Sequence, residues 1–182
     1  MKENKKIARN YAQALMGLSG SDLGLQETYL REIKSINELI NNVKEAKQVL
    51  ENPGITKDEK KKLVETFQHN ISATVVNFLY LLIDKNRFNI LSEIQDELTK
   101  LVNKAKGIVI AEVYSTKELD SSTANMIVET LRRSVSTDDV KEIKIDQRVD
   151  PLLIGGLKVK INDLVYDGSI KERLDNIKRR LG

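Results

Sequence analysis

The sequence contains no cysteine, no tryptophan, only one histidine and only two prolines. Without cysteine, the chain can form neither disulfides nor thiolate metal sites, and it has no thiol nucleophile. His69 is the only histidine, so a histidine metal cluster is excluded and a Ser-His-Asp triad would depend on this residue alone. Because His69 lies in a polar segment between two helical patterns, we expect it to occupy a solvated linker position.

Aromatic residues and long apolar runs are also scarce. Aromatics make up 4% of the chain, and they do not alternate with Lys and Arg in the way that suits stacking on bases. The longest apolar run covers 78–83, far short of the roughly 18 residues that span a membrane. No signal-peptide core follows the basic N-terminus. We therefore expect a cytoplasmic or plastid-stromal chain that reaches a membrane only through partners.

Composition favours a folded protein and gives no sign of a nucleic-acid partner. Hydrophobic residues account for 40% and charged residues for 31% of the chain, which is typical of globular domains. The 30 basic and 27 acidic residues leave a net charge of +3. This balance does not by itself indicate a polyanionic partner.

The first hundred residues predict six helices in succession, because apolar residues recur every three or four positions. The apolar stripes lie within 7–16, 25–40, 43–50, 57–67, 73–85 and 91–105. Asn52-Pro53-Gly54 ends the third helix, and Thr56 with Glu59 has the spacing of a capping box that opens the fourth. Ser72 is expected to cap the fifth helix.

The fifth helix is apolar around nearly its whole circumference, and the first has a broad apolar face. A helix of this kind is either central in its domain or covered on a second side by a partner. If the two helices lie side by side, they leave a groove that fits an amphipathic helix. The alternative is that both are simply core helices.

The period changes after Gly107. The pattern predicts a strand over 108–114, a helix over 121–135 and a strand over 143–147. Alternating residues then predict a hairpin that turns at Asn162-Asp163, and Ser169 with Glu172 has the spacing of a capping box for a terminal helix. The predicted fold class is α+β, mainly α. A six-helix bundle covers 1–106, and a small α+β domain with the hairpin and terminal helix covers 107–182.

No catalytic, cofactor or metal site is predicted. Glycine pairs and single glycines lack the spacing and following helix of a phosphate loop. Asp120, Asp138 and Asp139 have neighbours that favour turn and cap roles over metal binding. The basic cluster of Lys57, Lys60, Lys61 and Lys62 favours a solvated helix face over a nucleic-acid site.

Turn-forming residues (Gly, Pro, Asp and Asn) are most concentrated in the segment from Val149 to Ile170. This segment resembles a family signature. It is similar to the C-terminal motif of the delta subunit of bacterial and chloroplast ATP synthases, a relative of the mitochondrial oligomycin-sensitivity-conferring subunit. The matching residues here are Val149-Asp150-Pro151, Leu153-Ile154-Gly155-Gly156 and 165–170. Within them, a shaping role is expected for Asp150, Pro151, Gly155, Gly156, Asp167, Gly168 and Ser169.

The resemblance extends to the other end of the chain. The stretch 7–15 is similar to the family's opening, and 77–87 followed by Leu91 is similar to its fifth-helix region. Asn10 departs from the Arg or Pro often found there. The resemblance implies a groove between the first and fifth helices that receives the N-terminal helix of an alpha subunit. By motif position, the groove residues expected here are Ile7, Tyr11, Ala14, Leu15, Asn77, Leu81 and Leu82.

What the resemblance implies is a non-catalytic peripheral-stalk subunit of a proton-driven rotary ATP synthase. Such a subunit joins the catalytic alpha/beta head to the b-type stalk subunits and resists rotor torque, with its C-terminal domain facing the stalk. It lies at the cytoplasmic face of a bacterial or thylakoid membrane, or at the stromal face in a chloroplast. Arg173, Lys178, Arg179 and Arg180 either meet acidic stalk residues or complement a helix dipole. The alternative function is a helical-bundle RNA-binding module that uses the basic cluster.

Overall fold

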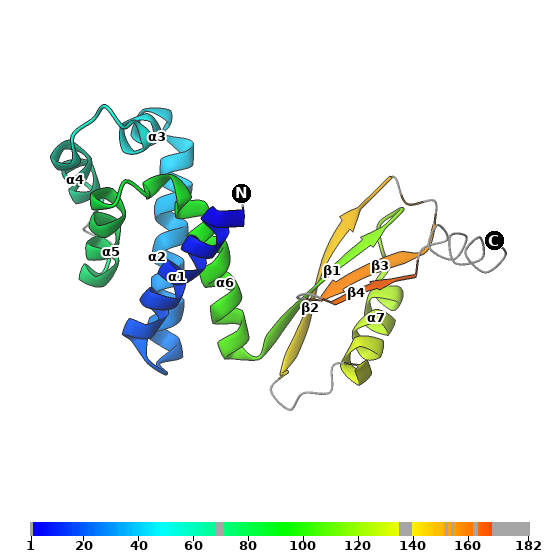
Figure 1. The fold of residues 1–182 in the computed structure, drawn as a ribbon. Coiled ribbons are helices and arrows are strands. Elements are labelled where there is room, and N and C mark those ends of the chain that lie inside the picture. Colours follow the sequence, from blue (N-terminus) through cyan, green and yellow to red (C-terminus); the bar gives the residue numbers. More distant parts are fainter. Residues whose placement is uncertain are drawn as a thin grey trace. The chain divides into compact units, whose positions relative to one another are not determined.

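The structure is a computed structural model that describes residues 2–67, 71–134, 140–151, 153, 155–161 and 164–168 (Figure 1). Contacts divide the chain into two compact units, Met1–Ala105 and Lys106–Gly182. The described part contains seven α-helices and one four-stranded sheet. This confirms the predicted α+β class with a majority of helix. The linker residue His69, the hairpin turn at 162–163 and the terminal helix from Ser169 lie outside the described residues.

The N-terminal unit is helical along most of its described length, and each predicted stripe lies on a helix. The elements are α1 (Lys2–Ser19), α2 (Leu23–Asn42), α3 (Lys44–Glu51), α4 (Lys57–Glu65), α5 (Ala73–Asp84), the short 3-10 helix η2 (Phe88–Ile90) and α6 (Leu91–Lys106). The sequence analysis did not anticipate η2. It continues directly into α6 and buries Phe88 and Ile90.

Caps define where these helices begin. Thr56 and Glu59 form the predicted capping box, with the Glu59 N–H 3.3 Å from the Thr56 hydroxyl and the Thr56 N–H 3.1 Å from the Glu59 carboxylate. The Thr56 hydroxyl also donates to the Glu59 carboxylate at 2.7 Å, and this bond, together with that from the Thr56 N–H, lowers the pKa of Glu59. Ser72 accepts from the Val75 N–H, as predicted for the start of α5. Asp22 caps α2 in the same way, which the sequence analysis did not single out.

The core of the N-terminal unit is built around α5. This helix buries six apolar side chains: Val75, Val76, Phe78, Leu79, Leu82 and Ile83. On α1, the buried side chains of the core are Ala8, Ala12 and Leu15. Small alanines bring a helix close to its neighbours while covering little apolar area. Ile7, Tyr11 and Met16 of α1 also pack against this core but stay partly exposed.

In its described residues, the C-terminal unit is a four-stranded sheet with one helix, α7, packed on it. Its elements are β1 (Ile108–Ser115), α7 (Ser121–Ser134), β2 (Glu142–Val149), β3 (Leu157–Ile161) and β4 (Leu164–Asp167). The strand order is β2-β1-β3-β4. β1 and β2 are parallel and joined through α7, whereas β3 is antiparallel to both β1 and β4. The predicted order of strands and helix is confirmed over the described part.

One face of the sheet holds the core of this unit. Apolar residues of β1, β2 and β3 pack with α7 there: Ala111, Val113, Leu131, Ile143, Val159 and Ile161. Asp120 caps α7 by accepting from the Thr123 N–H at 2.7 Å, and this bond lowers the pKa of Asp120. The cap role predicted for Asp120 is thus confirmed. Asp138 and Asp139 lie outside the described residues.

The motif residues lie at the ends of the strands. The Asp150 N–H donates to the Ser115 carbonyl at the end of β2, and Pro151 follows at an exposed turn. Gly155 and Gly156 precede β3, and Gly156 has a φ of 85°, which favours glycine. Their predicted shaping role fits these positions.

Gly168 follows Asp167, the last residue of β4, at a close backbone contact. The Gly168 N–H donates to the Leu157 carbonyl at 2.9 Å. A Cβ at position 168 would lie 3.2 Å from that oxygen. A glycine therefore suits this end of the hairpin, whereas Ser169 lies outside the described residues.

Candidate partner-binding groove

An open apolar groove of about 620 Å³ lies on the N-terminal unit, between α1 and the α5 region. Six of the seven residues that the sequence analysis proposed line it: Ile7, Tyr11, Ala14, Leu15, Asn77 and Leu81. Five others complete the lining: Asn10, Leu18, Thr74, Phe78 and Arg87. The structure therefore brings together residues that lie up to eighty positions apart in the sequence.

Leu82, the seventh proposed residue, corrects the prediction. Its side chain is fully buried, so it belongs to the core and is not available to a partner. Successive residues of a helix differ in direction by about 100°. Leu82 therefore points inward with Leu79 and Val75, while Leu81 lies on the groove wall and is 43% exposed.

The groove has a buried floor and exposed apolar walls. Leu15 and Phe78 are buried, while Leu18 is 67% exposed on α1. Ala14 is exposed between Tyr11 and Leu18 and offers no bulk that would hold a partner's backbone away. A concave apolar surface with large exposed side chains marks an interaction site. Its walls on two helices suit an apolar helix face.

Tyr11 on the α1 wall contacts both Phe78, on the groove floor, and Arg87. Its ring meets Phe78 edge to face, with centroids 6.1 Å apart. The Arg87 guanidinium lies 5.8 Å from the centre of the Tyr11 ring, and Arg87 Nη1 donates to the Tyr11 hydroxyl at 3.3 Å. Sequence reasoning did not identify Arg87 as a groove residue. The available signal was its place at the end of 77–87, the stretch that resembles the family.

Two lysines of the basic cluster on α4 contact the end of α5. Lys57 Nζ donates to the Asp84 carbonyl at 2.7 Å, and Lys61 Nζ lies 2.7 Å from the Asp84 carboxylate. The hydrogen bond with Asp84 raises the pKa of Lys61, and the same bond lowers the pKa of Asp84. Lys60 is only 6% exposed. The expected solvated face holds for Lys57 and Lys62, which are exposed, but not for Lys60. Lys57 and Lys61 also tie α4 to the end of α5.

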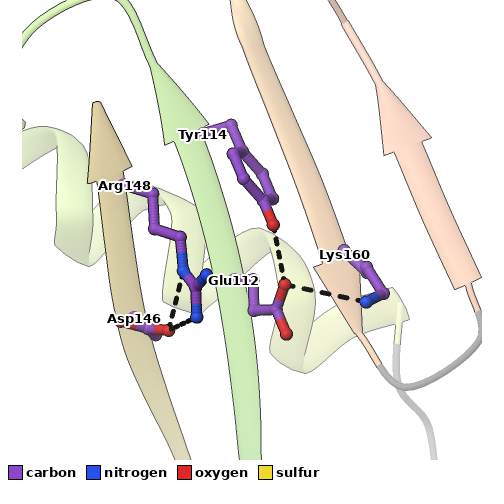
Figure 2. Close-up of polar contacts among 5 residues, drawn as sticks. All are labelled: Glu112, Tyr114, Asp146, Arg148 and Lys160. Carbon is purple, nitrogen blue, oxygen red and sulfur yellow. Dashed lines mark hydrogen bonds and ion pairs between the residues drawn. The ribbon is translucent and has the colours of Figure 1, made fainter. Parts of the chain in front are cut away.

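The sheet face opposite α7 carries polar and charged side chains that pair with one another (Figure 2). The Tyr114 hydroxyl donates to the Glu112 carboxylate at 2.9 Å, and Lys160 Nζ lies 3.7 Å from the same carboxylate. Arg148 donates to Asp146 through Nε at 3.3 Å and Nη2 at 3.0 Å. The Glu112 bond raises the pKa of Tyr114. Only the Lys160–Glu112 pair joins two strands, since Tyr114 lies on β1 with Glu112 and Arg148 lies on β2 with Asp146. None of these pairs brings a nucleophile and a base into contact.

The described residues contain no group of three or more His, Asp or Glu side chains placed to hold a metal ion. None of the helices in the described part combines the length and apolar character needed to cross a bilayer. Fold and groove together define a class: a mainly helical α+β protein whose described surface carries an open apolar groove between helices.

Comparison with known proteins identifies the family. The family described as ATP synthase delta (OSCP) subunit matches residues 7–181. ATP synthase subunit delta of Desulforamulus reducens is 39% identical over 176 residues, covering 96% of this chain and 94% of that protein. The subunit delta of Bacillus pumilus is 33% identical over 175 residues, covering 96% and 94%.

A similar fold occurs in a solved structure. One chain of the cryo-EM structure of the mitochondrial ATP synthase hexamer of Toxoplasma gondii has a TM-score of 0.69, with 13% identity and 96% of each chain covered. The present chain belongs to the ATP synthase delta (OSCP) subunit family. Its role is that of a non-catalytic peripheral-stalk subunit of ATP synthase. The comparisons give no support to the RNA-binding alternative.

Proposed function

We propose that this chain joins the catalytic head of ATP synthase to the b-type stalk subunits and holds the head against the torque of the rotor. Helices α1–α6 form the family's six-helix bundle in this proposal, and the bundle is the part that binds the head. The observation that carries the proposal is the open apolar groove, which is lined by six of the seven residues expected from motif position.

The occupant we propose is the amphipathic N-terminal helix of the alpha subunit. Ile7 and Leu18, at the limits of the α1 wall, are eleven residues apart. At 1.5 Å per residue this wall is about 16 Å long, which matches roughly three turns of a helix. An apolar stripe of that length would cover Leu18 and Leu81, the large apolar side chains of the lining that are exposed. Burial of this apolar surface supplies the affinity.

The C-terminal unit faces the b-type subunits in this proposal. Its edge strand β4 exposes three consecutive apolar side chains, Leu164, Val165 and Tyr166. Exposed apolar residues on an edge strand are commonly covered by a partner. The complex would hold the chain at the cytoplasmic face of a bacterial or thylakoid membrane, or at the stromal face in a plastid.

Calorimetry of the full chain with a peptide from the alpha-subunit N-terminus tests the groove. Leu81→Asp places a carboxylate against the apolar face of the peptide and should weaken binding about tenfold or more. Leu25→Asp is a matched control, because Leu25 is also 43% exposed in the N-terminal unit but does not line the groove. It should leave the affinity unchanged.

Circular dichroism should show that both variants keep the helical content of the parent chain. Tyr11→Asp provides a second groove variant and should also weaken binding. Absence of peptide binding by the parent chain would contradict the proposed site, as would an equal loss for Leu81→Asp and Leu25→Asp.

A further inference from the structure

Arg87 is the one charged side chain among the described residues that line the groove. The other ten lining residues are apolar or neutral and polar. A single cation beside an apolar channel is a strong local feature, because charged groups are otherwise depleted at the centre of interfaces while Arg is enriched. The position of Arg87 therefore bears on which partner fits.

The backbone fixes Arg87 at this place. Asn86 has a φ of 53°, in the left-handed region, and its N–H donates to the Ile83 carbonyl at 3.0 Å. The Arg87 N–H donates to the Leu82 carbonyl at 2.8 Å. These two bonds are the pair that defines a Schellman turn at a helix end. The turn stops α5 and sends the next side chain towards α1.

The Arg87 guanidinium contacts Tyr11, and most of its N–H donors have no protein acceptor among the described residues. Its contacts in the described structure are the face of the Tyr11 ring and the Tyr11 hydroxyl. A guanidinium has five N–H donors, and the Tyr11 hydroxyl accepts from one nitrogen. No ion pair joins Arg87 to a carboxylate among the described residues. The side chain is exposed, so water satisfies the remaining donors in the free chain.

Docking of an apolar helix changes the hydration of the Arg87 guanidinium. A helix that covers the groove removes water from part of the guanidinium, and a charge without a new partner then opposes binding. A carboxylate on the incoming helix would restore the lost hydrogen bonds, because its two oxygens match the planar donor fork of Arg. The Tyr11 contact limits the rotamers of Arg87, so less entropy is lost when the pair forms.

We propose that Arg87 is a specificity-determining residue, and that it pairs with an Asp or Glu side chain flanking the apolar stripe of the helix in the groove. The pair fixes the register of that helix against α1 and α5, since only one placement brings the carboxylate to Arg87. This inference rests on the proposed function, because it assumes that a helix occupies the groove.

A double-mutant cycle by calorimetry tests the pair. The alpha-subunit N-terminal peptide is measured as such and with each Asp or Glu changed singly to its amide, against the parent chain and Arg87→Gln. Arg87→Gln should weaken binding of the unchanged peptide about tenfold, as for close charge pairs at interfaces. One amide peptide should bind the parent chain about tenfold more weakly, yet bind Arg87→Gln no worse than the unchanged peptide does.

Two further variants separate the pair from general charge effects. Arg9→Gln makes the same change in net charge at an exposed position of α1 that does not line the groove, and it should leave affinity within about twofold. Arg87→Lys keeps the charge without the planar fork and should recover only part of the affinity.

The outcomes distinguish this inference from the proposed function. If the peptide binds the parent chain but Arg87→Gln behaves like Arg9→Gln, the pair is refuted and the groove assignment stands. The pair is also refuted if each amide substitution changes the peptide's affinity equally for the parent chain and for Arg87→Gln. That result would point to backbone carbonyls or water as the partners of Arg87. If the parent chain binds no peptide, the groove assignment and the pair both fail.

Discussion

The groove on the N-terminal unit and the sheet face opposite α7 on the C-terminal unit differ in how their side chains are partnered. On the sheet face, charged groups pair with one another, whereas the groove exposes apolar side chains and a cation without a carboxylate partner among the described residues. On the sheet face, Glu112 accepts from Tyr114 and lies beside Lys160, and Asp146 accepts from Arg148 (Figure 2). In the groove, apolar side chains stay exposed and the one lining charge has no carboxylate partner among the described residues.

This difference shows where binding energy can arise. A charged pair that is already formed gains little from a partner, because the partner must first displace it. Exposed apolar area gains free energy on burial without losing an existing contact. The groove is therefore the stronger candidate for a tight, specific interface. On the C-terminal unit, the exposed apolar edge of β4 is a better candidate than the charged face.

The largest expected effect separates core from groove on α5. Leu82→Ala removes a fully buried side chain and should lower the free energy of unfolding of the N-terminal unit by about 2–5 kcal/mol. Leu81→Ala should change it by less than about 1 kcal/mol but should weaken peptide binding. Urea unfolding followed by helical circular dichroism measures the first quantity. Equal destabilisation by the two variants would refute this division of the helix.

The second comparison uses glycines from the two units. Gly156 has a φ of 85°, so Gly156→Ala should destabilise the C-terminal unit by about 1–2 kcal/mol. Gly17 lies in α1, and a Cβ added there would meet no atom within 4 Å, so Gly17→Ala should be neutral or stabilising by up to about 1 kcal/mol. Thermal unfolding reports both. A neutral Gly156→Ala would show that the motif glycine has another role.

The next prediction concerns the capping box of α4, where we expect a smaller change in stability that depends on pH. Because the pKa of Glu59 is lowered in the folded chain, its carboxylate stabilises the fold above the unfolded pKa. That contribution is lost as pH falls through the lower folded value. The stability difference between the parent chain and Glu59→Gln should therefore shrink on acidification below about pH 4.5. In a Thr56→Ala background this pH dependence should largely disappear.

The smallest expected effect concerns the paired sheet face. Glu112→Gln should leave stability within about 0.5 kcal/mol, but the raised pKa of Tyr114 should fall back towards its ordinary value of 10.0. Ultraviolet titration of tyrosinate measures this shift. Asp146→Asn should lower the pKa of Tyr114 less than Glu112→Gln does, because the contribution of Asp146 is smaller. The reverse order would contradict the geometry of Figure 2.

Much of the fold could be predicted from the sequence, because helix and strand periods are local. The apolar stripes located each described α-helix, β-branched residues located the strand before α7, and alternation located the strand after it. The capping residues Thr56, Glu59 and Ser72 act on N–H groups within three positions, so spacing alone identified them. The 3-10 helix η2 is three residues long and too short to show a period.

The groove could be predicted only in part. Periodicity shows that α5 is apolar all round but not which side meets the core, so Leu81 and Leu82 could not be separated. The Arg87–Tyr11 contact joins residues 76 positions apart, so no local sequence pattern could predict it. The contacts of Lys57 and Lys61 with Asp84 could not be predicted for the same reason, because Asp84 lies on another helix.

The central claim is that the groove fastens this chain to the catalytic head, and the most direct measurement is recovery of the native ATP synthase on tagged chains. The parent chain should recover alpha, beta and b-type subunits together from detergent extracts of its source membrane. Leu81→Asp should lose most of the alpha and beta subunits while keeping the b-type subunits, and Leu25→Asp should match the parent. Full recovery of alpha and beta subunits on Leu81→Asp, or recovery of none of these subunits on the parent chain, would contradict the account.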